Sequence, residues 1–371
     1  MASHHTFLPA GRLLPLAAAA CAGILALTSC GNSGAQADAS AAGPFPTKGS
    51  GTLNLYNWTN YIPPKLVKRF ESETGIKVNI DVFESNEQML AKLQAGGSGY
   101  DVVVPSDHMV QQMIKLGLLQ QIDAGSFPNG KNIKPEFADD YFDEGRKYTV
   151  PYMYGTAGFA YDKTKLSNPP TSWKEFFNPP AAADGKMGLH NDSTEVVGAA
   201  LRAVGSRPCS ETPADYQKVQ TLLRSLKPKL KVISSDGTID RLASGELTLS
   251  SIWNGSYHRA SVKRKDLEYV YPSEGLTLWQ DNLAVPKGAQ HVDNAKIFIN
   301  WMMDPKNMAE ASNFTAYDNG ITGAEQYMDE ALRKDPAITI PADKAALAKP
   351  VQPCSQTALD LYDKVWTDFK G

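Results

Sequence analysis

Five short segments of this chain combine aromatic rings with carboxylate, amide or hydroxyl side chains, and each follows the end of an apparent β-strand. The segments are Asn57–Tyr61, Val104–His108, His190–Glu195, Ser251–Ser256 and Leu278–Leu283. Carboxylates pair with cations, and aromatic faces both attract a cation and pack on hydrocarbon. The residue types therefore indicate a binding site for a cationic or amino-bearing solute.

No catalytic motif accompanies these segments. The sequence has no H-E-x-x-H, G-x-S-x-G, G-x-G-x-x-G or Walker A pattern, and no EF-hand loop. Of the six histidines, His4 and His5 lie near the N-terminus and the others are scattered, which argues against a histidine-built metal site. We therefore expect a protein that is not an enzyme and that holds no cofactor and no metal ion. The competing enzyme hypothesis, a secreted lyase or transferase, requires a nucleophile or base in the cleft.

The same segments also have structural interpretations. Asp192-x-x-Glu195 has the spacing of a helix capping box, and Ser106 is placed to cap the following helix. A place in the core or at its rim fits the tryptophans of these segments, Trp58, Trp253 and Trp279. Asp281 is harder to explain in this way, because a carboxylate in an apolar strand needs a cationic or hydrogen-bonding partner.

Two series of alternating strands and helices must position these segments. The first predicts strands over 52–57, 76–83 and 101–104 and helices over 64–74, over 87–95 and from Ser106 to about 117. The second predicts strands over 156–161, 247–252 and 276–286 and helices near 172–178, 194–204, 214–226, 237–244, 293–303, 305–313, 324–334 and 355–370. Such alternation is typical of an α/β fold with parallel strands, in which ligands bind beyond the carboxyl ends of the strands. Two such units predict two lobes with a ligand cleft between them.

The N-terminal segment has the pattern of an export signal. Arg12 precedes an apolar stretch, Leu13–Leu27, which is shorter than the roughly 20 residues of a membrane-spanning helix. The stretch ends in Leu27-Thr28-Ser29-Cys30, which resembles the bacterial lipobox, whose cysteine becomes lipidated. The alternative is an ordinary signal peptide with a chance cysteine. Residues 31–51 are rich in Gly, Ala, Ser and Pro, which is typical of a flexible tether.

Charge and cysteine content limit the possible partners and the compartment. With 37 Lys and Arg against 40 Asp and Glu, the net charge is −3, so no basic field is present to attract nucleic acid. Of the four cysteines, Cys21 and Cys30 belong to the export segment, which leaves Cys209 and Cys354. In an oxidising compartment this pair is a candidate disulfide, the alternative being two unpaired thiols.

Several motifs, in order along the chain, resemble the bacterial spermidine/putrescine-binding proteins of polyamine ABC importers, which are periplasmic solute-binding proteins. The motifs are Leu55–Pro64, Phe83–Glu87, Tyr100–Ser106, Ile252–Ser256 and Trp279–Pro286, and the likeness extends from Thr52 to the C-terminus. The resemblance implies a two-lobe periplasmic-binding-protein fold that captures a polyamine. The alternative is a protein of the same fold for another cationic or amino-bearing solute.

The resemblance also implies the ligand-binding residues. In the first lobe they are Trp58, Thr59, Tyr61 and Ser106. In the family a D-x-x-E pair holds a terminal ammonium, and it matches Asp192 and Glu195; the W-x-D carboxylate placed for an inner amine matches Asp281, with Trp279 beside it. The remaining matches are Trp253, Ser235, Tyr317 and Gln352. Two positions depart from the family pattern, Asn60 and His108, so the sequence leaves the preferred polyamine open.

The resemblance and the residue pattern together give a domain plan and a set of partners. The plan assigns residues 1–29 to a lipoprotein signal peptide, 30–51 to the tether, 52–153 plus 282–325 to the N-terminal lobe, and 154–281 plus 326–371 to the C-terminal lobe. We expect a monomer in the periplasm or on the outer face of the cytoplasmic membrane, held there only by a lipid on Cys30. Its partners would be the polyamine and an inner-membrane ABC permease, and not nucleic acid.

Overall fold

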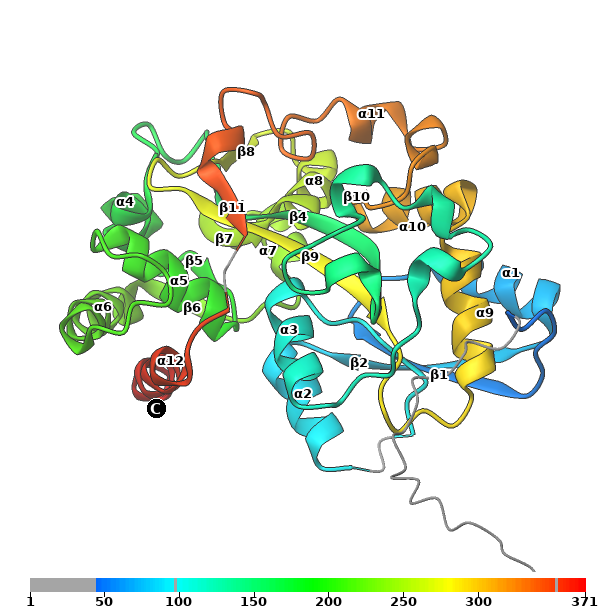
Figure 1. Ribbon diagram of the computed structural model, residues 1–371. Coiled ribbons are helices and arrows are strands. Elements are labelled where there is room, and N and C mark those ends of the chain that lie inside the picture. The colour runs from blue at the N-terminus through cyan, green and yellow to red at the C-terminus, as the bar shows by residue number, and fades with distance from the viewer. Residues whose placement is uncertain (1–44, 97–98, 351–352) are drawn as a thin grey trace, which may run out of the picture. The chain divides into compact units, whose positions relative to one another are not determined.

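The computed structural model describes residues 45–96, 99–350 and 353–371 (Figure 1). The predicted signal peptide, Cys30 and Gln352 lie outside the described residues. Near the predicted end of the tether, Phe45 packs edge-on against Phe127, and the carbonyl of Ser50 accepts a hydrogen bond from Asn294. These last tether residues therefore contact the fold.

The strands of the described part of the chain form one mixed sheet in the order β2-β1-β3-β9-β4-β7-β5-β6, with β8 and β10 paired to β4 and β11 paired to β9. The strands are β1 (Thr52–Trp58), β2 (Lys77–Phe83), β3 (Val102–Val103), β4 (Thr149–Asp162), β5 (Met187–Leu189), β6 (Leu230–Ile233), β7 (Leu249–Trp253), β8 (Leu267–Val270), β9 (Leu276–Ala284), β10 (Asp318–Asn319) and β11 (Ala348–Pro350).

Helices cover both faces of this sheet, and none of those described is long and apolar enough to cross a membrane. The helices are α1 (Pro64–Thr74), α2 (Asn86–Gln94), α3 (Asp107–Lys115), α4 (Trp173–Phe177), α5 (Ser193–Ala203), α6 (Pro213–Leu226), α7 (Thr238–Ser244), α8 (Asn254–Lys263), α9 (Val292–Met302), α10 (Pro305–Thr315), α11 (Glu330–Arg333) and α12 (Gln356–Lys370). Short 3-10 turns fill much of the irregular stretch between α3 and β4.

The first lobe is built on β1, β2 and β3, which pair in parallel. Alternation along β1 sends Leu55 to a core shared with α1 and α9, and Tyr56 to a separate core shared with α2 and α3. Since parallel strands end at the same edge of a sheet, the loops after β1, β2 and β3 lie together there. Two of the predicted binding segments, Asn57–Tyr61 and Val104–His108, lie at the ends of β1 and β3 at this edge.

The second lobe repeats this plan with β5, β6 and β7, which also pair in parallel. Phe159 and Leu249 face a core covered by α4, α5, α6 and α12. Ala160 on β4 and Ile252 on β7 face the other core, which α7 and α8 cover. In Figure 1 these helices surround the half of the sheet that lies away from β1 and β2.

Two long strands, β4 and β9, connect the lobes. They pair antiparallel with each other, β9 reaches β3 through Ala284 and Val103, and β4 reaches β7 from Tyr161 to Ala157. Their register shifts between Pro151 and Tyr154, and a β-bulge of this kind bends a strand. The predicted two-lobe α/β fold is confirmed, and its two halves share one sheet.

Most predicted elements are present, and the errors have local causes. The helix predicted over 324–334 is wrong, because the structure has a 3-10 turn at Ala324–Gln326 and the short α11 in its place. The first half of β4 was not predicted, since Pro151 is unusual within a paired strand. Helix α8 was also missed, and its polar sequence shows why.

The predicted disulfide is confirmed. Cys209 and Cys354 are bonded, with their Cα atoms 5.0 Å apart and with a separation of 145 positions in the chain. The bridge joins the loop after α5 to the segment that precedes α12. A disulfide that closes so long a loop restricts the unfolded chain and typically contributes about 2–4 kcal/mol of stability.

Candidate functional site

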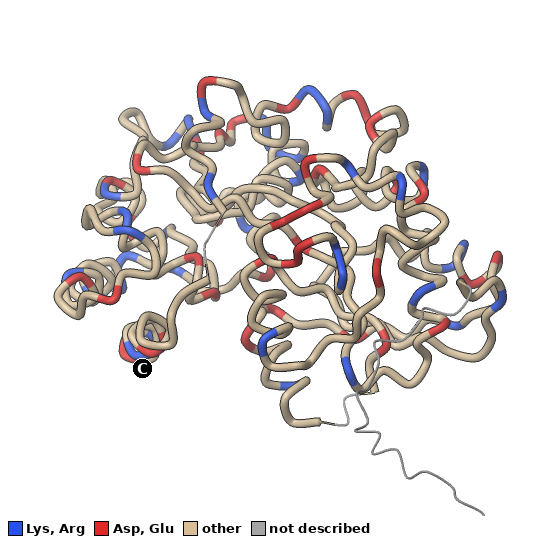
Figure 2. The backbone as a smooth tube through the Cα atoms, in the orientation of Figure 1, with Lys and Arg blue, Asp and Glu red and all other residues tan. Residues whose placement is uncertain are grey.

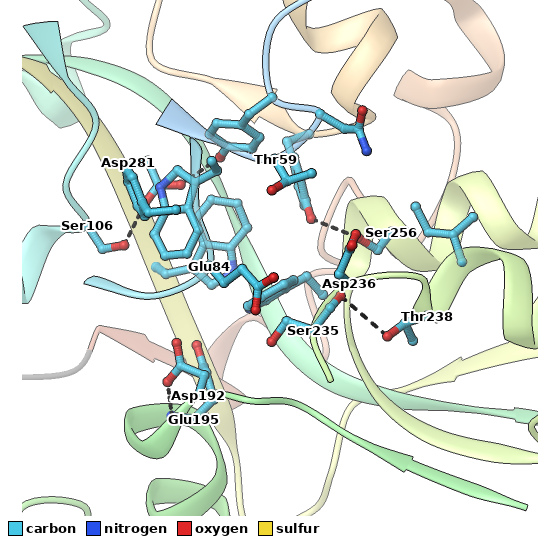
Figure 3. A pocket seen from close by; sticks show the side chains of 18 of the residues that line it. Thr59, Glu84, Ser106, Asp192, Glu195, Ser235, Asp236, Thr238, Ser256 and Asp281 are labelled. Carbon is cyan, nitrogen blue, oxygen red and sulfur yellow. Dashed lines mark hydrogen bonds between the residues drawn. The ribbon is translucent and has the colours of Figure 1, made fainter. Parts of the chain in front are cut away.

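A cavity of about 290 Å³ lies between the two lobes, at the carboxyl ends of the strands of both halves. This volume is close to the lower limit of small-molecule sites, about 300 Å³. Every predicted ligand-binding residue that the structure describes lines the cavity: Trp58, Thr59, Tyr61, Ser106, Asp192, Glu195, Ser235, Trp253, Trp279, Asp281 and Tyr317. Figure 3 labels ten of the lining residues, among them Asp281 and Ser106 on one side and Asp192 and Glu195 on another.

Asp281, on the connecting strand β9, is the most constrained carboxylate of the cavity. It is 5% exposed, and its two oxygens accept hydrogen bonds from the hydroxyls of Tyr61 at 2.7 Å and Ser106 at 2.6 Å. Within the described residues it forms no ion pair with a Lys, Arg or His side chain. Burial raises the pKa of Asp281 to about 7, although the two hydrogen bonds oppose the rise. A cation placed beside this buried carboxylate would stabilise its charged form.

Ser106 occupies the N-cap position of α3, but its side chain does not cap the helix, which corrects the expected role. Its hydroxyl donates to Asp281 instead, and Asn86 fixes it from the other side. The Asn86 amide nitrogen donates to the Ser106 hydroxyl, and the Asn86 oxygen accepts from the Ser106 backbone N–H, both at 3.0 Å. Asn86 thus orients a hydroxyl that serves Asp281.

Asp192 and Glu195 form a second acidic group at the start of α5. Asp192 caps the helix by accepting from the Glu195 backbone N–H at 2.9 Å, so the capping interpretation of Asp192 holds. The cap uses one carboxylate oxygen, and Asp192 still lines the cavity. Burial, with smaller contributions from Glu87 and Glu195, raises the pKa of Asp192 to about 8, and burial raises that of Glu195 to about 7. Both roles proposed for Asp192 are therefore compatible.

Aromatic rings form a continuous wall beside Asp281. Trp279 meets Tyr317 edge-on at 4.9 Å, and Tyr317 meets Tyr61 at 5.8 Å. The wall needs a glycine on the neighbouring strand, because a Cβ at Gly155 would lie 2.7 Å from the Trp279 ring. The wall offers π faces and edges at van der Waals distance from any chain that passes Asp281.

The other two tryptophans are held by contacts outside the cavity. Trp253 stacks on His190 at 4.2 Å, and burial lowers the pKa of His190 to about 3, so the imidazole is neutral and places no charge behind the ring. The Trp58 indole donates to the carbonyl of Val104 at 2.9 Å, and its ring packs against Phe83 at 4.6 Å. The Trp58 and Trp253 rings thus pack against a core and also line the cavity, so the structural role and the binding role considered for them are compatible.

Hydroxyl groups complete the lining. The backbone N–H of Asn191 donates to Ser235 at 3.0 Å, and the hydroxyls of Ser256 and Tyr317 lie 3.3 Å apart. Thr59 reaches the cavity from the loop after β1 (Figure 3).

Sequence reasoning missed several charged residues of the cavity. Glu84 and Asp236 also point toward it in Figure 3, and Glu84 directly follows β2, the same signal that identified the other segments. His108 closes one of the predicted segments but was otherwise noted as a departure from the family pattern. Arg259 and Lys263 were missed together with α8, on which they lie.

The wall of the cavity is acidic even though the chain as a whole is not. Acidic and basic residues are interspersed along the described chain in Figure 2, yet the cavity gathers carboxylates from both lobes. The carboxylates are Glu84, Asp192, Glu195, Asp236, Asp240 and Asp281, against the cationic or titratable groups His108, Arg259 and Lys263. Lys263 pairs with Asp240 at 2.7 Å, so the remaining surplus favours a cationic ligand.

Comparisons with known proteins agree with this geometry. A family model for bacterial extracellular solute-binding proteins matches residues 65–340. The putrescine-binding periplasmic protein SpuD of Pseudomonas aeruginosa is 33% identical over 332 residues, which cover 85% of this chain and 88% of that protein. The spermidine/putrescine-binding periplasmic protein 1 of Haemophilus influenzae is 33% identical over 320 residues and covers 85% of this chain and 88% of its own length.

A solved structure shows the same likeness in three dimensions. The substrate-binding protein PotD of a spermidine/putrescine ABC transporter from Streptococcus pneumoniae superposes with a TM-score of 0.71 at 29% identity. The superposition covers 86% of this chain and 98% of that chain.

The raised pKa of Asp281 predicts an unusual pH dependence of the ligand-free protein. Because the folded state keeps the Asp281 proton up to about pH 7 while the unfolded chain loses it near pH 4, stability falls as pH rises between these values. Asp281→Asn should therefore be more stable than the native chain at pH 8, by roughly 1–3 kcal/mol, and equally stable at pH 4.5. Urea unfolding at the two pH values measures the difference.

The matched control is Glu211→Gln, which neutralises an exposed carboxylate outside the cavity and should change stability little at either pH. A native chain that is more stable than Asp281→Asn at pH 8 would show that the carboxylate has a cationic partner within the protein.

Proposed function

Since this chain belongs to the family of bacterial extracellular solute-binding proteins, we propose that it captures a polyamine and delivers it to an ABC importer. The observation that carries the proposal is Asp281, a buried carboxylate with two hydroxyl donors and no cationic partner in the described chain. Removing one member of a buried ion pair typically leaves an uncompensated charge that costs about 3–5 kcal/mol. A ligand ammonium supplies the missing partner.

A polyamine matches the arrangement of the remaining lining residues. One ammonium would pair with Asp281, and a second with Asp192 and Glu195 at the other acidic group. The methylene groups between them would pack on the rings of Trp279, Tyr317 and Trp253. The two acidic groups then define the spacing of charges that the site accepts.

Binding of this kind requires no chemical step. The lining residues serve as charge partners, hydrogen-bond partners or packing surfaces, and we propose that the protein is a binding protein without enzymatic activity. Its partners would be the polyamine and a membrane permease, and it would act as a monomer.

Lobe closure would complete the site. We propose an N-terminal lobe of residues 52–153 plus 282–325 and a C-terminal lobe of residues 154–281 plus 326–371. The lobes would hinge where β4 and β9 pass from one lobe to the other. The bulge between Pro151 and Tyr154 lies beside this boundary on β4, and Asp281 lies at it on β9. Closure would exclude water from the ion pairs and thereby strengthen them.

The central test of the function is the affinity for polyamines. Calorimetric titration at pH 8 with putrescine, cadaverine, spermidine and spermine should show saturable binding, whereas amino acids and sugars should not bind. Asp281→Asn keeps the shape of the side chain and removes its charge, so the affinity for the best polyamine should fall at least about a hundredfold. Wild-type affinity in Asp281→Asn would mean that Asp281 does not hold the ligand.

Closure gives a second prediction, which does not depend on a mutation. Saturating polyamine should reduce the radius of gyration measured by small-angle X-ray scattering, because the lobes would approach each other around the ligand. An equal concentration of a non-binding sugar is the control. An unchanged radius at full occupancy would exclude hinged closure.

The predicted attachment of the protein concerns residues outside the described part. We propose that Cys30 carries a lipid that holds the protein on the outer face of the cytoplasmic membrane. Expression in a bacterial host with a labelled fatty acid should label the native chain and leave Cys30→Ala unlabelled. Equal labelling of both chains would rule out Cys30 as the acceptor.

A further inference from the structure

His108 lies at the junction of two hollows in the structure. It lines the ligand cavity, and with Thr194 it also lines a second hollow of about 240 Å³ between α3 and the segment leading into α12. A ligand longer than the cavity would have to pass His108 to enter this second hollow. The imidazole therefore stands where the next group of a longer ligand would be.

The His108 ring is anchored on one side and free on the other. Its Nδ1 lies 3.3 Å from an oxygen of Asp107, whereas its Nε2 is buried and has no hydrogen-bond partner among the described residues. The side chain is 20% exposed. The Asp107 contact fixes the ring at the cavity wall, and the Nε2 atom without a partner lies buried in that wall.

Carboxylates on three helices and one strand surround this ring. Asp107 lies on α3 itself, Glu87 on α2, Asp192 at the start of α5 and Asp281 on β9. Burial lowers the pKa of His108, but the Asp107 contact and the other carboxylates raise it to about 9 overall. The ring is therefore an internal cation that offsets one of these negative charges.

The second hollow offers no replacement for that charge. Among the described residues, its lining includes Lys115 and no carboxylate. A ligand ammonium that moved from the cavity into this hollow would move away from Asp192. It would then pass the His108 cation and approach Lys115. Two positive charges repel each other more strongly in a partly buried site than in bulk water.

Cations also bound the cavity in the direction of α8. Ser256, Arg259 and Lys263 lie three and four residues apart, so they follow one face of α8 away from Trp253. Lys263 is paired with Asp240, whereas Arg259 lies over the Phe314 ring at 5.6 Å and forms no ion pair within 4 Å among the described residues. The acidic middle of the cavity thus lies between a cation on α3 and a cation on α8.

We propose that His108 is the residue that sets ligand length, by occupying the place of a third ammonium and so making the site selective for short diamines over triamines. This inference rests on the proposed polyamine function and adds the class of polyamine. Asp281 holds one ammonium and the Asp192–Glu195 pair holds the other. A third ammonium would meet His108 at one end or Arg259 at the other.

Calorimetry with putrescine and spermidine tests the inference on three chains. The native chain should bind putrescine more tightly than spermidine at pH 7. His108→Gln keeps a polar side chain and removes the cation, which leaves Asp107 and Glu87 available to pair with a third ammonium. The ratio of the two dissociation constants should then move at least about tenfold toward spermidine. Lys68→Gln, which removes an exposed cation of α1 outside the cavity, should leave the ratio unchanged.

The outcomes separate this inference from the function on which it rests. A native chain that prefers spermidine, or a ratio in His108→Gln within about twofold of the native one, overturns the role of His108 while polyamine binding stands. A native chain that binds neither amine overturns both. If His108→Gln does not fold, which its melting curve would show, His108→Asn is measured in its place against the same criteria.

Discussion

The structure around the cleft depends on one buried charge. Asp281 is placed on a strand that both lobes share, where desolvation would be costly without partners. Two hydroxyls, from Tyr61 and Ser106, satisfy part of its hydrogen-bonding capacity but add no positive charge. The first lobe positions the Ser106 hydroxyl for this contact. The Ser106 side chain donates to Asp281 and does not cap α3, and a hydrogen bond from Asn86 holds it in place.

The position of Asp281 also links ligand binding to the proposed movement of the two lobes. Trp279 and Asp281 lie on β9, which pairs with β3 of one lobe and with β4, the strand that leads into the other. A ligand bound there contacts the segment about which the lobes would move. Asp192 likewise takes part in both the fold and the cavity, because one of its carboxylate oxygens caps α5 while the side chain lines the cavity. Structural and binding roles are therefore not alternatives in this site.

Much of the architecture follows from local patterns. The alternation of Leu55 and Tyr56 between two cores, and the prolines and glycines that begin and end α1, are visible in the sequence and specify strand and helix directly. The failures have identifiable reasons. Helix α8 was not predicted because its sequence is largely polar. Arg259 and Lys263, which lie on α8, were therefore missed as residues of the cavity. The stretch 324–334 has the composition of a helix but forms a turn and one short helix, because tertiary contacts override weak propensity.

The sequence by itself determined which residue types gather at the ends of the strands, and these residue types indicated a cationic or amino-bearing solute. It also determined the disulfide as a candidate, since only two cysteines remain beyond the export segment. Tertiary structure alone decided how the charges are partnered. The bonds from Ser106 and Tyr61 to Asp281 join residues 175 and 220 positions apart, and the ring of carboxylates around His108 comes from four separate elements. No local pattern encodes such contacts, because hydrogen bonding and desolvation depend on which groups the completed fold brings together.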